Sequence, residues 1–196
     1  MTGKRIFILN GHPGGRSLSR AFADAYADRA AAAGHDVRVA HLEDLAFDMD
    51  FGGGGYSDWK PLEPALEGVM RNIEWAEHIV IATPMWWGGM PAKLKGLFDR
   101  ILLPGRGFDT RVTKMGMPTP MLGGRTARVI VTSDTPGWYL RLVHRNAMLR
   151  QIGGHVLGFV GIRPTRFTYF AGATDAAPGR VAGWVERVAR LGAAGA

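Results

Sequence analysis

The chain has 196 residues, no cysteine and a formal net charge of +7. This length fits one domain, expected over residues 1–196, and the absence of cysteine excludes disulfides, zinc–thiolate sites, iron–sulfur clusters and thiol nucleophiles. No apolar run of about 18 residues exists, and the N-terminus lacks the long apolar region of a signal peptide, so we expect a cytoplasmic protein without a membrane span. Basic residues are scattered and no nucleic-acid motif is present, so nucleic-acid binding is not expected.

The first predicted strand, Lys4–Leu9, runs into a loop rich in glycine and hydrogen-bonding side chains, Asn10–Ser17. Apolar residues at helical spacing then predict a helix over Leu18–Ala33, which Gly34 ends. Backbone N–H groups and the helix dipole favour an anion at such a helix start, so the loop is suited to phosphate. The alternative interpretation is that its serines only cap the helix and its glycines only turn the chain.

A second strand is predicted over Asp36–Leu42, parallel to the first. The residues that follow, 43–55, form an irregular excursion that ends in four consecutive glycines, which are costly inside a regular element. An amphipathic helix then begins near Pro61 and continues to about Ile73.

The third predicted strand, His78–Ala82, precedes the most informative loop of the chain, Met85–Met90, which contains two adjacent tryptophans and two glycines. A helix follows from Pro91 to Ile101. Ligands of open α/β sheets bind at the carboxyl ends of the strands, and a flat aromatic loop there suits a flat aromatic ligand. Our hypothesis is that this loop holds a flavin ring. The alternative is that the tryptophans pack under a loop or across a dimer interface.

The remaining pattern predicts a long loop over Pro104–Gly124 and a fourth strand over Thr126–Thr132, followed by a polar turn. A helix over 138–152, a fifth strand over 156–162, a short extension over 165–170 and a closing helix over 178–191 complete the chain. Strands that alternate with helices predict an α/β fold with a doubly wound, five-stranded parallel sheet. Turns 11–17, 85–89 and 133–137 are therefore expected at one edge of the sheet. The six histidines lack metal-ligand spacing, so no metal site is predicted.

Three segments carry a family resemblance: GHPGGRSLSRAF after the first strand, TPMWWGGMPAKLKGLFDRIL after the third and SDTPGWYLRLV after the fourth. They resemble the flavodoxin-like NAD(P)H:quinone oxidoreductases, over about Arg5 to Thr165. The resemblance implies the strand order 2-1-3-4-5, a bound flavin (FAD or FMN), and hydride transfer from NAD(P)H to a quinone-like acceptor by a ping-pong mechanism. It also implies a homodimer with the flavin site at the subunit interface.

By position, the resemblance implies three sets of flavin contacts. The phosphate side would be contacted by His12, Ser17, Leu18 and Ser19, and the ring by Pro84, Met85, Trp86, Trp87 and Gly88. The other side of the ring would be lined by Ser133, Asp134, Thr135 and Pro136. The mammalian quinone reductases have, after the fourth strand, a glycine-rich stretch followed by a tyrosine and a histidine that assist charge transfer. This chain has DTPGWYLRLVH there, which differs in length and chemistry. Tyr139 and His144 are therefore the nearest catalytic candidates, although a structural role inside a helix is the alternative for His144.

Two other functions fit a flavodoxin-like chain. The first is a regulatory or ancillary subunit, for example of a potassium-efflux system, that binds flavin or nucleotide without turnover. The second is an electron-carrier flavodoxin, but those proteins are typically acidic, whereas this chain has a pI near 10. The sequence does not choose between FMN and FAD, between NADH and NADPH, or among aromatic acceptors.

Overall fold

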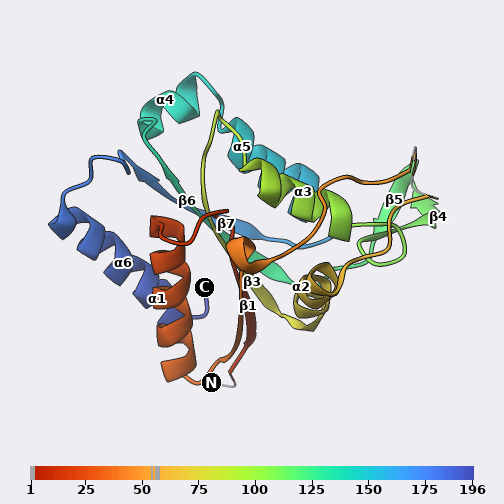
Figure 1. Cartoon of the computed structure of the whole chain (residues 1–196), viewed down its shortest axis with the longest axis horizontal. Coiled ribbons are helices and arrows are strands. Elements are labelled where there is room, and N and C mark those ends of the chain that lie inside the picture. Colours follow the sequence, from red (N-terminus) through yellow and green to blue (C-terminus); the bar gives the residue numbers. More distant parts are fainter. Residues whose placement is uncertain (1–2, 54, 56–57) are drawn as a thin grey trace.

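The computed structural model describes residues 3–53, 55 and 58–196. Its main sheet has five parallel strands in the order β2-β1-β3-β6-β7, with helices on both faces (Figure 1). The strands are β1 Arg5–Asn10, β2 Asp36–His41, β3 His78–Pro84, β6 Thr126–Ser133 and β7 Thr165–Ala171. Counting only these parallel strands, the order is 2-1-3-4-5. The predicted flavodoxin-like, doubly wound fold is therefore confirmed.

Burial follows from the position of each strand in the sheet. The central strand β3 is buried along its whole length, and β1 and β6 are buried except at their first residues. These strands are continuous β-branched and apolar runs, as expected for parallel strands covered on both faces. The edge strand β2 has no buried residue and carries Asp36 and Arg38 on exposed positions. Charged side chains on such an edge oppose pairing with another chain.

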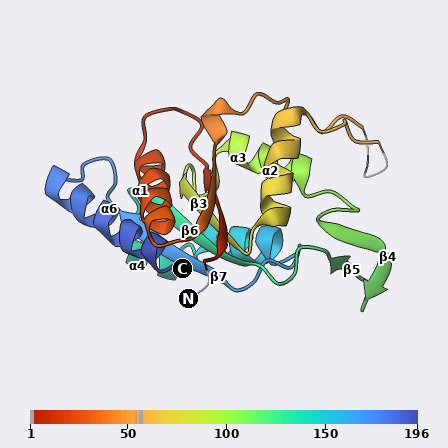
Figure 2. The same ribbon diagram turned by 90° about the horizontal axis from the view of Figure 1, so that it is seen from below.

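Two apolar cores lie on opposite faces of the sheet, because side chains alternate along a strand. Helices α1 Leu18–Ala32 and α6 Pro178–Ala193 cover the core that contains Ile6 and Ile8, while Phe7 and Leu9 belong to the other core. Helices α2 Pro64–Trp75, α3 Ala92–Ile101 and α5 Ala147–Arg150 lie on that second side (Figure 2). The division leaves the carboxyl edge of the sheet to the connecting turns.

The fifth strand was predicted at the wrong residues. Residues 156–162 are not a strand: a π-helical segment, η2 Gln151–Leu157, continues from α5 and ends in turns. The strand is β7, which the sequence suggested only as a short extension. An apolar run does not by itself distinguish a buried helix from a strand. Gly153 adds the tertiary reason, since a Cβ there would lie 2.9 Å from the Phe167 ring of β7, so the helical backbone packs closely on that strand.

Two further predictions need correction. The single helix predicted over 138–152 is broken into α4 Gly137–Leu142 and α5, because Arg145 and Asn146 between them have φ of 48° and 53°. The predicted long loop over 104–124 contains a hairpin, β4 Phe108–Lys114 and β5 Met117–Pro120, at the end of the molecule remote from α6 (Figures 1 and 2). The excursion after β2 begins with a 3₁₀ turn, η1 Leu42–Asp44. Its other described residues are irregular apart from a bridge between Gly52 and Trp59. Gly54, within the glycine run, lies outside the described residues.

Candidate functional site

Three turns lie at the carboxyl edge of the central strands β1, β3 and β6. The Gly11 amide donates to the Ala82 carbonyl at 2.7 Å, which joins the first turn to β3, and the Met85 amide donates to the Thr132 carbonyl at 2.8 Å, which joins the second turn to β6. The rings of His12 and Trp86 meet edge to face, with centroids 5.5 Å apart. The first and second turns are therefore in direct contact, and the third follows the strand beside the second.

The first turn leads into α1 through a capped helix start. Ser17 is the N-cap, and its hydroxyl accepts from the Arg20 amide at 3.1 Å. An open cavity of about 510 Å³ lies against this turn and the first residues of α1, and Arg16 and Arg20 line it with Ser17. Leu18 is half-buried, whereas Ser19 is buried, so contact of Ser19 with a ligand would use its backbone. A helix N-terminus, a hydroxyl and the Arg16 guanidinium suit a phosphate. Arg20 is also paired with Glu43 and with Asp24, whose carboxylate lines the same cavity.

Asn10, Glu43 and Arg20 fix the shape of this first turn. Buried Asn10 donates to Glu43 at 3.1 Å and accepts from the His12 amide at 3.2 Å, while the other Glu43 oxygen accepts from Arg20. Nδ1 of His12 lies 2.9 Å from the Gly14 amide nitrogen, which donates to it in the Nε2-protonated tautomer. Glu43, which follows β2 directly, is therefore bound to the phosphate-side turn.

The second turn is a tight hairpin that exposes its tryptophans. Trp86 and Gly89 exchange two backbone hydrogen bonds of 2.9 Å, and the two residues between them have positive φ, 51° for Trp87 and 75° for Gly88. This is the geometry of a type I′ turn, which is strained for a bulky residue. Trp87 is fully exposed and Trp86 is 44% exposed. The interpretation in which both tryptophans pack under the loop is therefore wrong.

Other residues predicted around the ring have different surroundings. Pro84 is the buried last residue of β3, and Met85 packs partly against the core next to α3. At Gly88 a Cβ would meet no atom within 4 Å, so the turn is open on that side. A ligand at this edge therefore has Trp86, Trp87 and Gly88 within reach as exposed groups, and Pro84 and Met85 as the base of the turn.

The third turn joins β6 to α4. Ser133 is buried, Thr135 is half-buried, and Asp134 and Pro136 are exposed. Both carboxylate oxygens of Asp134 accept from Thr174, one from its amide at 2.8 Å and one from its hydroxyl at 2.7 Å. These hydrogen bonds hold the pKa of Asp134 below its usual range.

The two predicted catalytic residues lie together. Tyr139 is on α4, and His144 is in the turn after α4 rather than inside a helix, as the alternative interpretation required. Their rings meet at 5.1 Å with an interplanar angle of 72°, and both side chains are at least partly exposed. The break after α4 therefore allows the Tyr139 and His144 rings to come into contact.

A family described as having a flavodoxin-like fold matches residues 4–191. The chain belongs to this flavodoxin-like family. The predicted resemblance to flavodoxin-like quinone oxidoreductases is confirmed by its relatives. A Ruegeria pomeroyi protein named FMN-dependent NADH:quinone oxidoreductase is 37% identical over 147 residues, covering 66% of this chain and 70% of the relative.

A Cereibacter sphaeroides protein of the same name is 36% identical over 111 residues, which is 57% of this chain but only 53% of the relative. Among solved structures, Smu.1420 from Streptococcus mutans has a TM-score of 0.83 at 22% identity, covering 96% of this chain and 98% of that one. The NAD(P)H:quinone oxidoreductase from Methanothermobacter marburgensis has a TM-score of 0.79 at 22% identity, covering 98% of both chains. The structural likeness shows that the fold is shared.

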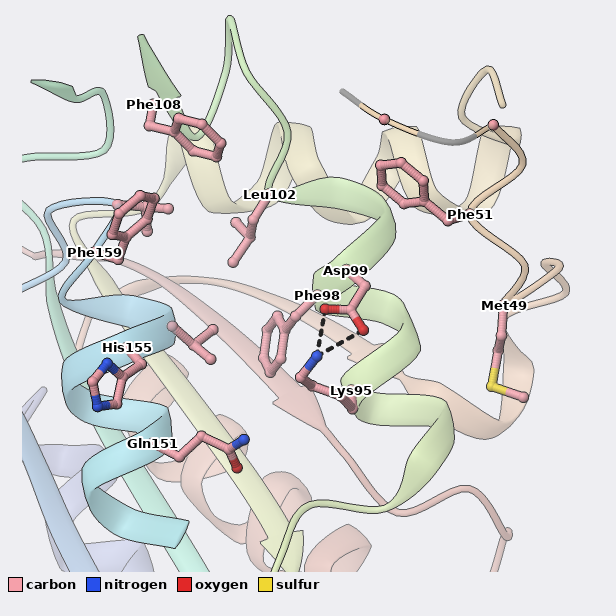
Figure 3. Close-up of a pocket in the computed structure, with 14 residues that line it drawn as sticks. Met49, Phe51, Lys95, Phe98, Asp99, Leu102, Phe108, Gln151, His155 and Phe159 are labelled. Atoms are coloured by element: carbon pink, nitrogen blue, oxygen red, sulfur yellow. Dashed lines mark hydrogen bonds and ion pairs between the residues drawn. The ribbon is translucent and has the colours of Figure 1, made fainter. Parts of the chain in front are cut away.

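A separate cavity of about 720 Å³ lies along α3 of this flavodoxin-like protein (Figure 3). Phe98 of α3, Leu102 just after it, Phe108 at the start of β4 and Phe159 after η2 form its apolar wall. The paired Lys95 and Asp99 lie on α3. None of its lining residues is a predicted flavin contact. The phosphate-side turn and the two tryptophans therefore lie outside this cavity.

Within residues 3–53, 55 and 58–196, no three His, Asp or Glu side chains form a group able to hold a metal ion. None of the helices in that part of the chain has the length and apolar character needed to traverse a bilayer.

Proposed function

We propose that this protein is a flavin-dependent oxidoreductase that carries hydride from NAD(P)H through bound flavin to a quinone or a similar small aromatic acceptor, by a ping-pong exchange. The observation that carries this proposal is the exposed Trp86–Gly89 turn, which contacts His12 of the phosphate-side turn at the carboxyl edge of the sheet. Relatives named FMN-dependent NADH:quinone oxidoreductase support the same activity.

The residues of this edge fit a flavin nucleotide. Ser17, the backbone of Leu18 and Ser19, and the guanidinium groups of Arg16 and Arg20 would hold the phosphate at the 510 Å³ cavity. The exposed tryptophan faces and the backbone amides of the second turn suit a planar ring that gains negative charge on reduction. The third turn would line its other side. The bound flavin supplies the two-electron chemistry, while these residues bind it, orient it and exclude water.

FMN is the flavin and NADH the hydride donor that we propose first, because the relatives are named for both. FAD presents a similar phosphate to the first turn and remains the alternative flavin. A cytoplasmic location belongs to the same proposal, since the reaction consumes NAD(P)H.

Tyr139 and His144 are proposed as the catalytic pair that balances charge on the reacting ring. Their edge-to-face ring contact, with centroids 5.1 Å apart, supports a shared role because it holds a phenol and an imidazole side by side. Replacing Tyr139 by Phe and His144 by Gln should each lower kcat with little change in flavin content. Unchanged kcat in both variants would remove these residues from the mechanism.

We further propose that the protein is a homodimer. Helix α4 presents Trp138 and Leu142, which are four residues apart, and Val143 beyond it, with exposed fractions of 64%, 69% and 53%. An exposed apolar patch of this kind favours association, and a second copy of the chain is the partner that the family resemblance implies. Light scattering should give twice the chain mass, and Leu142→Asp with Val143→Asp should shift it toward the monomer. A monomeric wild type would contradict the proposal.

The test of function begins with the purified protein. We expect a yellow protein, release of FMN on denaturation identified by mass, and NADH oxidation that depends on added quinone. Initial rates at several fixed quinone concentrations should give parallel double-reciprocal lines, as ping-pong kinetics require. A colourless protein that cannot be reconstituted with FMN or FAD would refute the proposal. Flavin binding without turnover would favour the regulatory-subunit alternative.

A further inference from the structure

The third turn is held in place by residues that lie outside all three turns. Tyr169 of β7 donates its hydroxyl to the Thr135 carbonyl at 2.6 Å. Thr174, in the segment between β7 and α6, donates to both carboxylate oxygens of Asp134. The turn that would line one side of the flavin is therefore fixed by the neighbouring edge strand and by the loop that follows it.

Every residue of the turn before Pro136 takes part in a hydrogen bond that fixes its position. The Ser133 hydroxyl accepts from the Thr135 amide at 3.1 Å, and the Ser133 carbonyl accepts from the Ala173 amide at 3.3 Å. A Cβ on Gly137 would lie 3.8 Å from the Tyr169 ring, so α4 begins directly over that ring. One tyrosine thus supports both the turn and the start of the helix that carries Tyr139.

The hydrogen bonds also decide the role of Asp134. With both oxygens accepting from Thr174, its carboxylate links two loops and stays ionised at neutral pH, since a carboxylate that accepts hydrogen bonds resists protonation. Asp134 is therefore unsuited to donate a proton to the flavin or to the acceptor.

We propose that Tyr169 and Thr174 are positioning residues for the flavin-binding turn Ser133–Pro136, with Asp134 as the anchor for Thr174. This inference rests on the proposed function. Tyr169 directs the Thr135 carbonyl toward β7, so that the opposite surface of the turn faces the flavin ring. Thr174 fixes the tip of the turn from the side.

The test uses the full-length, flavin-reconstituted protein with Tyr169→Phe and Thr174→Val. Each variant loses one side-chain donor, and we expect the dissociation constant for FMN to rise about five- to tenfold, as for one lost hydrogen bond. The visible absorption bands of the bound FMN should shift, because the ring meets a displaced turn. Thr174 is exposed, so its variant is expected to fold even if Tyr169→Phe is unstable.

Two variants serve as matched controls. Tyr26→Phe removes a tyrosine hydroxyl that donates to the Ala196 carbonyl at 3.3 Å on the α1 and α6 side of the sheet. Thr165→Val acts at the other end of β7, where the threonine hydroxyl lies 3.5 Å from the Ile162 carbonyl. Each control loses a hydroxyl that makes a longer contact away from the turn, so FMN affinity and spectrum should match those of the wild type.

The outcomes separate the two proposals. Weaker FMN binding with shifted absorption bands in Tyr169→Phe and Thr174→Val, but not in the controls, supports the inference. FMN affinities within about twofold of the wild type and superimposable spectra would overturn it, even if melting temperatures fall. If the wild type itself binds neither FMN nor FAD, the proposed function fails first and this inference fails with it.

Discussion

The backbone of Trp87 offers a direct test of the ring site. Its φ of 51° is left-handed, and the side chain is fully exposed, so no apolar burial compensates for that conformation. A bulky L-residue in this region costs roughly 1–2 kcal/mol, whereas asparagine adopts it more readily. Trp87→Asn should therefore stabilise the apoprotein by about 1 kcal/mol, which corresponds to a melting temperature about 2–4 °C higher for a chain of this size.

The same substitution should impair flavin binding. Loss of one aromatic contact with the ring removes roughly 0.5–1.5 kcal/mol, so the dissociation constant for FMN should rise about two- to tenfold. Urea denaturation of the apoprotein gives the stability change, and titration of FMN fluorescence gives the affinity. Strain retained at a functional position in this way would explain why a tryptophan occupies a position that suits asparagine or glycine.

Met115 provides the matched control. It has φ of 53°, is 96% exposed, and precedes Gly116 in the turn of the β4–β5 hairpin, as Trp87 precedes Gly88. Met115→Asn should give a similar gain in stability with unchanged FMN affinity. If Trp87→Asn destabilises the apoprotein while Met115→Asn stabilises it, the strain argument is wrong. If both bind FMN as the wild type does, Trp87 does not contact the flavin.

Three further predictions concern helix packing, pH and the phosphate-side turn. A Cβ on Gly192 would lie 2.3 Å from the Tyr26 carbonyl oxygen, so Gly192→Ala should lower the free energy of unfolding, measured by urea denaturation, by about 1–3 kcal/mol. Gly183 on the same helix has open space around it, so Gly183→Ala should raise that free energy by about 0.5–1 kcal/mol. Burial, with nearby basic groups, lowers the pKa of His78 to about 4. Because the unfolded chain takes up this proton near pH 6.5, the free energy of unfolding falls as pH drops from 6.5 toward 4. His78→Gln should remove about 3 kcal/mol of this fall, and a variant with the same dependence of unfolding free energy on pH as the wild type would contradict the prediction. Ser17→Ala should cost about 1 kcal/mol through the lost helix cap, while Ser17→Asp should keep stability but weaken FMN binding by repelling its phosphate; equal FMN affinity in Ser17→Asp and the wild type would argue against a phosphate there.

Most of the sheet could be predicted because its signals are local. The buried strands are short, apolar and largely β-branched runs, and the first and third of the chain are each followed by a glycine-containing turn and a helix with a regular apolar face, as in Lys4–Leu9 followed by Leu18–Ala33. Alternation of such units leaves few topologies open. The common edge of the three turns follows from this alternation, whereas the strand order was implied by the family resemblance.

The fifth strand could not be identified from its own residues. Val156–Ile162 is apolar enough for a strand, but it continues a helix because Gly153 allows close packing against Phe167. In β7, buried and half-buried positions are interspersed, because β7 is an edge strand, so its signal was weak. The choice between the two segments depends on packing between residues distant in sequence.

The sequence by itself determined the fold class, the turn that suits phosphate and the paired tryptophans, because composition and spacing within a few residues encode each of them. Only the tertiary structure decided that Trp87 is exposed in a left-handed conformation, that Glu43 pairs with Arg20, and that Tyr169 and Thr174 hold the third turn. The contacts of Glu43, Tyr169 and Thr174 each join segments more than twenty residues apart. The strain at Trp87 depends on two backbone hydrogen bonds that close its turn. Such contacts exist only once the sheet has brought its edges together.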